Sequence, residues 1–206
     1  MKSKIENFFL DSNDIENFKV KYIDYFKQAL SQVDEIKLSV VLEEIISCQK
    51  RGGKIISFGN GGSAANAAHF CTGISYVTRN WESPISAMSL NQDTILITSL
   101  ANDLGYEQIF YRQLQVVAKK EDLVVGFSVS GKSKNVVNAL KFAKEKKMRT
   151  VGFLGSDGGD VLSLVDIPVL IENTNTLLGF TEDIHMTICH IVAYYLEFSY
   201  KNDRSE

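Results

Sequence analysis

The chain has 206 residues, of which 45% are hydrophobic, and it carries a formal net charge of −3 at pH 7. This length allows one sizeable hydrophobic core, and we expect a single domain over residues 1–206. The slightly acidic balance argues against nucleic acid or an anionic membrane surface as the main partner, because both attract basic protein surfaces.

Three widely spaced cysteines, Cys48, Cys71 and Cys189, form no Cys-x-x-Cys pair. The sequence therefore predicts buried reduced thiols rather than a disulfide framework or a thiolate zinc site. The N-terminus meets acidic residues early and lacks the apolar core of a signal peptide. No uninterrupted apolar run approaches the roughly 20 residues that span a bilayer. These features predict a cytoplasmic protein.

Two amphipathic helical patterns come first, at residues 14–33 and 35–51, and Gly52 and Gly53 end the second. Strands and helices then alternate along the chain. The predicted strands cover residues 54–58, 85–90, 123–129, 149–154 and 167–171, and the predicted helices begin at residue 63 or cover 106–119, 134–147 and 181–200. This alternation predicts an α/β fold with a parallel sheet between two helical layers. We expect a helical segment at 1–53 and an α/β core at 54–200, and we place the ligand at the carboxyl ends of the strands.

Two loops of small residues each follow a predicted strand and precede a predicted helix. They read Gly-Asn-Gly-Gly-Ser at residues 59–63 and Ser-Val-Ser-Gly-Lys-Ser at residues 128–133. Glycine lets the backbone approach a ligand closely, and the free N–H groups of a helix N-terminus favour an anion. Neither loop matches a Walker P-loop or a dinucleotide-binding fingerprint. The pair predicts a phosphate site that does not belong to a nucleotide.

The two loops and three further motifs carry a resemblance to a known family. The motifs are Phe-Gly-Asn-Gly-Gly-Ser-Ala-Ala at 58–65 with His69 and Phe70, Ala-Asn-Asp-Leu-Gly-Tyr at 101–106, the loop at 128–133, Asp-Gly-Gly at 157–159, and Glu-Asp-Ile-His at 182–185 followed by His190. In this order they resemble the sugar isomerase (SIS) domain family, and within it the phosphoheptose isomerases. The resemblance implies a three-layer αβα sandwich with a five-stranded parallel, flavodoxin-like sheet.

The same resemblance implies an activity and an assembly. The expected reaction converts sedoheptulose 7-phosphate to D-glycero-D-manno-heptose 7-phosphate for a bacterial surface glycan, lipopolysaccharide or capsule, through an enediol. The expected assembly is a homotetramer, and the amphipathic patterns at 14–33 and 35–51 are expected to pack between subunits. Carried over position by position, the substrate-binding residues are Asn60, Gly61, Gly62, Ser63, Asn102, Asp103, Ser128, Val129, Ser130, Ser133 and Glu182. Val129 replaces a family threonine, so its backbone alone is expected to contribute.

The family's zinc site is matched only in part. His69 and His190 match two ligands, but the glutamate expected four residues after His69 is Gly73, and the family glutamine is Glu182. The missing glutamate also has a proton-transfer role in the family. We therefore predict zinc on His69, Glu182 and His190, with Glu182 and His190 as the catalytic residues. Helical geometry puts Glu182 and His190 about 80° apart around one helix, and His185, on the other side, is expected to be structural.

Two other functions are compatible with the same residues. The loss of the glutamate at Gly73 suits a non-catalytic module that binds a phosphosugar or a protein partner, as in the DnaA initiator-associating relative. The segment from Gly73 to Arg79 departs from the family near the reacting end of the sugar, which suits an isomerase of a different sugar phosphate. Metal analysis of the purified protein would distinguish an isomerase from a binding module, because a stoichiometric divalent ion favours the enzyme.

Overall fold

One parallel sheet organises the protein, as seen in a computed structural model that describes residues 3–172 and 177–202. Its strands are β1 (Ile55–Gly59), β2 (Ala87–Ser89), β3 (Leu123–Ser128), β4 (Arg149–Ser156) and β5 (Ile167–Glu172). They follow the order β2-β1-β3-β4-β5, and every neighbouring pair is parallel. The α/β fold with a five-stranded parallel sheet is confirmed.

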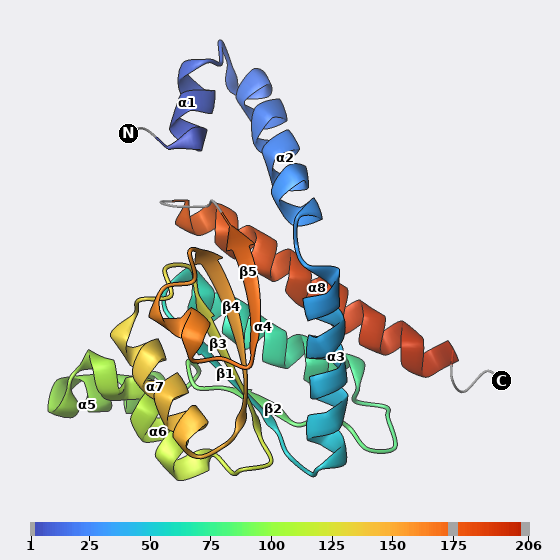
Figure 1. The fold of residues 1–206 in the computed structure, drawn as a ribbon, viewed down its shortest axis with the longest axis vertical. Helices are drawn as coiled ribbons and strands as arrows, with labels where there is room; N and C mark the ends of the chain where they lie inside the picture. The colour runs from blue at the N-terminus through green and yellow to red at the C-terminus, as the bar shows by residue number, and fades with distance from the viewer. Residues whose placement is uncertain (1–2, 173–176, 203–206) are drawn as a thin grey trace.

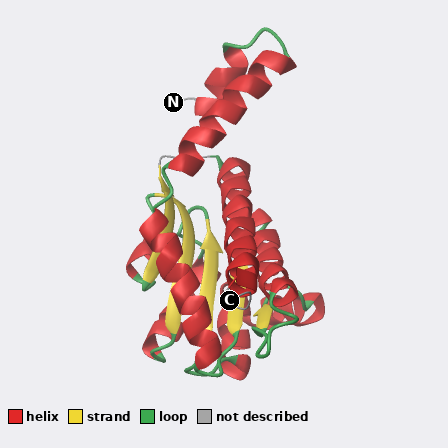
Figure 2. Cartoon of the chain, turned by 90° about the vertical axis from the view of Figure 1, so that its right-hand side faces the viewer, coloured by secondary structure: helices red, strands yellow, loops and turns green. Residues whose placement is uncertain are grey.

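Helices cover both faces of the sheet (Figures 1 and 2). One face carries α3 (Glu35–Lys50), α4 (Gly62–Val77) and α8 (Leu178–Asn202). The other face carries α5 (Thr94–Leu104), α6 (Ile109–Val117) and α7 (Lys134–Glu145), together with short 3₁₀ helices η1 (Tyr106–Gln108) and η2 (Asp160–Ser163).

Two hydrophobic clusters lie on opposite faces of the sheet. Within β1, Ile55 belongs to the cluster under α3, α4 and α8, whereas Ile56 and Phe58 belong to the cluster under α6 and α7. Successive side chains of a strand point to opposite faces, so a strand buried on both faces is apolar at nearly every position. This explains why the strands read as continuous apolar runs in the sequence.

The N-terminal helices divide into a packed helix and a protruding arm. Val41, Ile45 and Cys48 of α3 are fully buried, so the apolar face of α3 lies on the sheet. The prediction that residues 35–51 would pack between subunits was wrong for this face, because it packs on β3 and β5 of its own chain next to α8. Helices α1 (Lys4–Leu10) and α2 (Ile15–Ser31) extend beyond the sheet (Figure 2). The ring of Tyr25 in α2 stacks on Phe180 of α8 at 4.6 Å.

Helix α5 was not among the predicted elements. Asp93 caps it by accepting a hydrogen bond from the Leu96 N–H at 2.9 Å. It ends at Gly105, whose φ of +93° is open to glycine at little cost. The predicted helix at 106–119 therefore starts as η1 and continues as α6.

His185 is the fully buried histidine of α8. Its Nε2 lies 3.2 Å from the Leu154 carbonyl oxygen, and its ring meets the edges of Phe127 and Phe153. Its Nδ1 atom has no hydrogen-bond partner among the described residues. Burial lowers the pKa of His185 from 6.5 to about 4, against a smaller opposing effect of the bond to Leu154. The prediction of a structural histidine agrees with this packing.

Acid should destabilise the protein through His185. The unfolded chain binds a proton near pH 6.5 and the folded chain only near pH 4, so the stability that His185 contributes is lost as the pH falls through that window. We expect the free energy of unfolding to fall by about 2 kcal/mol between pH 7.5 and pH 5 on this account. Urea unfolding at pH 7.5 and at pH 5 measures this change in the free energy of unfolding. A His185→Gln variant with the same pH-dependent loss as the parent would contradict the assignment.

The three cysteines are free and buried, as predicted. Burial raises the pKa of Cys71 to about 11 and also raises that of Cys189, which keeps both thiols protonated and unreactive near neutral pH. None of the helices in the described ranges combines the length and apolarity needed to cross a membrane.

Candidate functional site

A cavity of about 510 Å³ opens at the carboxyl ends of β1 and β3, where α4 and α7 begin. Strands of a parallel sheet end at the same edge, so the two glycine- and serine-rich loops meet there. The cavity is lined by Asn60, Gly61, Gly62, Ser63, Phe127, Ser128, Val129, Ser130, Ser133, Leu178 and Glu182. It therefore gathers all the predicted substrate-binding residues except Asn102 and Asp103.

The first loop is held in place by a side chain from the next strand. Asn91, just beyond β2, accepts the Gly59 N–H at 3.1 Å and donates to the Gly59 carbonyl oxygen at 2.8 Å. Gly61 has a φ of +56° and caps α4 without a side-chain hydrogen bond. The loop thus turns sharply into α4 while Asn91 supplies both hydrogen bonds that β1 lacks at its end.

The second loop turns on Gly131, whose φ is +62°. Ser128 Oγ accepts the Gly131 N–H at 3.1 Å, and Ser130 Oγ accepts the Lys132 N–H at 3.2 Å. A Cβ on Gly131 would collide with the Gly158 carbonyl, so the loop rests directly on the turn at residues 157–159. The Gly159 N–H and, less strongly, Lys132 lower the pKa of Asp157 in that turn.

The N-terminus of α7 is available to an anion. Its N-cap Ser133 makes no side-chain hydrogen bond to the first turn in the described structure, and the 12-residue helix directs its positive dipole end into the cavity. Ser128, Ser130 and Ser133 line the same cavity, and serine hydroxyls are neutral hydrogen-bond donors. This is the chemistry of a phosphate site.

The N-terminus of α4 is occupied by a carboxylate of the protein itself. Glu182 Oε1 accepts the Ser63 N–H at 3.1 Å, and the side chain lies so close to Gly62 that no Cβ would fit there. Asn66 donates to the Glu182 carbonyl oxygen at 2.9 Å and joins α4 to α8. The two helix N-termini thus have different roles. The N-terminus of α4 binds the Glu182 carboxylate, and the N-terminus of α7 is left for the phosphate.

His69 and His190 meet elsewhere on the same helix pair. Their Nε2 atoms are 2.7 Å apart, the rings are edge to face at 87°, and both side chains are exposed. Helices α4 and α8 both start at the carboxyl edge of the sheet, so His190 lies about 12 Å further along α8 than Glu182. The structure brings the two histidines together but places Glu182 in the cavity.

The predicted three-residue metal site is accordingly not assembled. The described residues contain no group of three or more His, Cys, Asp and Glu side chains that could hold a metal ion. A Cβ added to Gly73 would meet the Cβ of Ala193 at 3.7 Å and no other neighbour within 4 Å among the described residues. Among the described residues, no carboxylate lies within 4 Å of that Cβ position.

Asn102 and Asp103 lie exposed in the last turn of α5 and outside the cavity lining, with Asn102 donating to Asp103 at 2.8 Å. Sequence reasoning missed three polar residues that hold the first loop: Asn91, Tyr106 and Asn135. Their signal was positional, because Asn91 and Asn135 each follow a strand at the carboxyl edge of the sheet.

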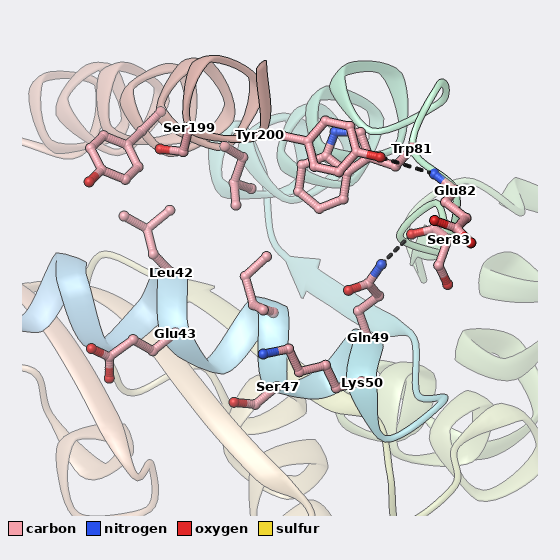
Figure 3. A pocket seen from close by; sticks show the side chains of 13 residues that line it. Leu42, Glu43, Ser47, Gln49, Lys50, Trp81, Glu82, Ser83, Ser199 and Tyr200 are labelled. Carbon is pink, nitrogen blue, oxygen red and sulfur yellow. Dashed lines mark hydrogen bonds between the residues drawn. The ribbon is translucent and has the colours of Figure 1, made fainter. Parts of the chain in front are cut away.

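A larger cavity, of about 970 Å³, lies apart from both loops, between α3, α8 and the segment after α4 (Figure 3). Trp81 stacks on Tyr200 with ring centroids 4.3 Å apart, and Gln49 donates to the Ser83 carbonyl. It lacks the small-residue loops and converging helix N-termini of the cavity at the carboxyl edge. The smaller cavity is therefore the candidate active site.

Comparisons with known proteins identify relatives of the chain by sequence and by structure. The SIS domain model matches residues 21–155. The phosphoheptose isomerase of Geotalea daltonii is 37% identical over 170 residues, covering 82% of this chain and 88% of that protein. The phosphoheptose isomerase of Helicobacter pylori strain P12 is 37% identical over 179 residues, covering 85% and 91%.

The solved structure of a phosphoheptose isomerase from Neisseria gonorrhoeae superposes with a TM-score of 0.78 at 28% identity, covering 89% of this chain and 96% of that one. The sequence and the fold thus point to the same relatives. The chain belongs to the SIS domain family and, within it, to the phosphoheptose isomerases.

Proposed function

We propose that the protein isomerises sedoheptulose 7-phosphate to D-glycero-D-manno-heptose 7-phosphate in the synthesis of a bacterial surface glycan. The observation that carries this proposal is the placement of a carboxylate, Glu182, in the same cavity of about 510 Å³ as the serine loop at the N-terminus of α7. One end of the cavity suits a phosphate and the other a proton transfer.

The chemistry follows from these residues. With the phosphate on the loop at 128–133, Glu182 removes the proton from the carbon beside the carbonyl, and the electron pair forms an enediol. Returning that proton to the neighbouring carbon, with a proton moving between the two oxygens, gives the aldose and restores the carboxylate. The Ser63 N–H at the N-terminus of α4 holds Glu182 in place for both steps.

We retain zinc as part of the proposal, with His69 and His190 as its ligands. The two Nε2 atoms face each other as a hydrogen-bonded pair 2.7 Å apart, and a modest separation of the rings would let both imidazoles bind one cation. The fit is incomplete, because Glu182 lies in the cavity and Gly73 has no side chain, so no step above passes through the metal. Bound zinc would polarise a carbonyl oxygen. Its remaining ligands would come from outside the described residues of one chain.

We also propose that the protein forms a homotetramer. Large side chains that are exposed in the single chain gather on α8: Ile191, Tyr194, Tyr195 and Phe198. The exposed pair of His69 and His190 lies beside them, with the His190 and Tyr194 rings 6.4 Å apart. Contiguous exposed apolar surface is typical of a subunit interface. The cytoplasmic location and the single domain remain predictions of the sequence.

The direct test follows sedoheptulose 7-phosphate by proton NMR in heavy water, with added zinc and after chelation, using protein whose fold is checked by circular dichroism. We expect the aldose to appear and solvent deuterium to enter beside the carbonyl. Loss of turnover on chelation supports zinc, and unchanged turnover removes it from the proposal. No exchange in either condition rejects this substrate and favours another sugar phosphate or a binding module.

A further inference from the structure

We propose that Asn135 and Tyr106 are positioning residues for the Asn60 amide: Asn135 fixes its orientation and Tyr106 holds it in place, so that Asn60 offers an N–H donor to the substrate. The inference rests on the proposed function, and it adds two residues that act on the substrate only through Asn60. It starts from a group of hydrogen bonds at the wall of the cavity.

Asn60 and Asn135 form a reciprocal amide pair. Asn60 Nδ2 donates to Asn135 Oδ1 at 2.9 Å, and Asn135 Nδ2 donates to Asn60 Oδ1 at 2.8 Å. Such a pair keeps both of its hydrogen bonds if both amides turn over together, so it does not by itself fix which atom of Asn60 faces the ligand. A third group must break this symmetry.

The backbone of α7 breaks it. The Val136 N–H donates to Asn135 Oδ1 at 3.0 Å, and a backbone N–H is always a donor. Asn135 Oδ1 must therefore face Val136, which leaves Asn135 Nδ2 to meet an oxygen. Asn135 is only 2% exposed, so an unpaired amide there would be costly. The Val136 N–H therefore sets the orientation of the Asn135 amide, and Asn135 in turn sets the orientation of the Asn60 amide.

Tyr106 holds the Asn60 side chain in place, but because a hydroxyl can donate or accept, Asn135 sets the orientation of the amide. Its hydroxyl donates to Asn60 Oδ1 at 2.9 Å from η1, directly after α5. Asn60 Oδ1 thereby accepts two hydrogen bonds, and one N–H of Asn60 Nδ2 is taken by Asn135. The second N–H of Nδ2 remains, on a half-buried side chain that lines the cavity.

Asn60 in this orientation presents a donor, which suits a carbonyl, hydroxyl or phosphate oxygen of a sugar phosphate. Turned over, it would present an oxygen, which repels the acceptor oxygens of a carbonyl or a phosphate. Asn135 therefore selects the ligand without contacting it, and Tyr106 keeps Asn60 in place. They also tie the loop at 59–63 to α7, which carries the phosphate site at its N-terminus.

Two variants test the inference, with Tyr111→Phe as the matched control. Tyr111 lies on α6, where its hydroxyl accepts from Gln115 at 2.9 Å, and it does not line the cavity. We expect Tyr106→Phe, which changes an exposed side chain and should leave the fold intact, to lower kcat/KM about fivefold through the loss of one neutral hydrogen bond. Tyr111→Phe should leave kcat/KM unchanged.

The second variant, Asn135→Asp, gives a readout that a merely structural role would not produce. At pH 8 the introduced carboxylate places an oxygen opposite Asn60 Oδ1 in either orientation of the amide, so the reciprocal pair is broken and the orientation is no longer fixed. At pH 5.5 the protonated form of the introduced side chain donates again and restores the original orientation. We therefore expect the ratio of variant to parent kcat/KM to rise on acidification. A ratio independent of pH, together with full activity of Tyr106→Phe, would overturn the inference.

Side-chain amide NMR of the ligand-free protein separates this inference from the proposed function. One Asn60 Nδ2 proton should exchange slowly with solvent in the parent and rapidly in Asn135→Ala, which lacks the Oδ1 acceptor of that proton. Equal exchange of that proton in the two proteins would overturn the inference, whatever the activity. A parent that fails to isomerise sedoheptulose 7-phosphate but shows the protected proton would reject the substrate and leave the positioning role supported.

Discussion

Replacing Glu182 with glutamine should lower kcat for sedoheptulose 7-phosphate by at least about 100-fold, the usual size of a lost general base. Glutamine keeps an oxygen for the Ser63 N–H, which donates to Glu182 at 3.1 Å in the parent, so the helix N-terminus stays satisfied. It cannot take up a proton from carbon. KM should change little, because the phosphate site on α7 is untouched. Steady-state kinetics by NMR measures both constants.

Glu145→Gln is the matched control for this substitution. Glu145 is exposed at the C-terminal end of α7, at the opposite edge of the sheet from the cavity. The control should retain the kcat of the parent. Equal kcat values for Glu182→Gln and the parent would remove Glu182 from the chemistry and leave the pair of His69 and His190 as the remaining candidate.

Gly131→Ala should destabilise the protein by about 2–4 kcal/mol and abolish tight binding of the sugar phosphate. A Cβ there collides with the backbone of Gly158, which costs about 1–3 kcal/mol as overpacking. The φ of +62° adds about 1 kcal/mol for a residue with a side chain. The loop at 128–133 must move, and its N–H groups and hydroxyls then no longer converge on one anion. Urea unfolding and calorimetric titration with sedoheptulose 7-phosphate measure the two effects.

Gly73→Ala should stabilise the protein, in contrast to Gly131→Ala. Gly73 lies inside α4, and a Cβ there would touch only the Cβ of Ala193 at 3.7 Å among the described residues. Alanine should raise the free energy of unfolding by up to about 1 kcal/mol, since glycine is a poor helix former. If both alanine variants lost the same stability, the crowding at Gly131 would not be the cause.

Much of the fold follows from local patterns in the sequence. The runs at 54–58 and 123–129 are apolar at nearly every position because β1 and β3 are buried on both faces, and the glycines and serines after them mark the turns into α4 and α7. Helix α5 was missed because β-branched residues at 94, 95, 97 and 98 hide its helical pattern. Its cap at Asp93 was the available signal.

The assembly of the site depended on how the elements pack. The angle between Glu182 and His190 around α8 could be estimated from the sequence, but it did not say which neighbour each would face. Because α4 runs beside α8 from the same edge of the sheet, Glu182 meets Ser63 and His190 meets His69. Glu182 and His190 therefore lie about 12 Å apart along the axis of α8.

The sequence by itself determined the α/β class, the two loops of the phosphate site and the likeness to the sugar isomerases, because these depend on residue types at fixed local spacing. Only the tertiary structure decided that Glu182 lies at the N-terminus of α4, away from the two histidines. It likewise decided that Asn60 is held by Asn135 and Tyr106. Such contacts join residues 46 to 119 positions apart, and their partners are set by the packing of helices on the sheet rather than by any local pattern.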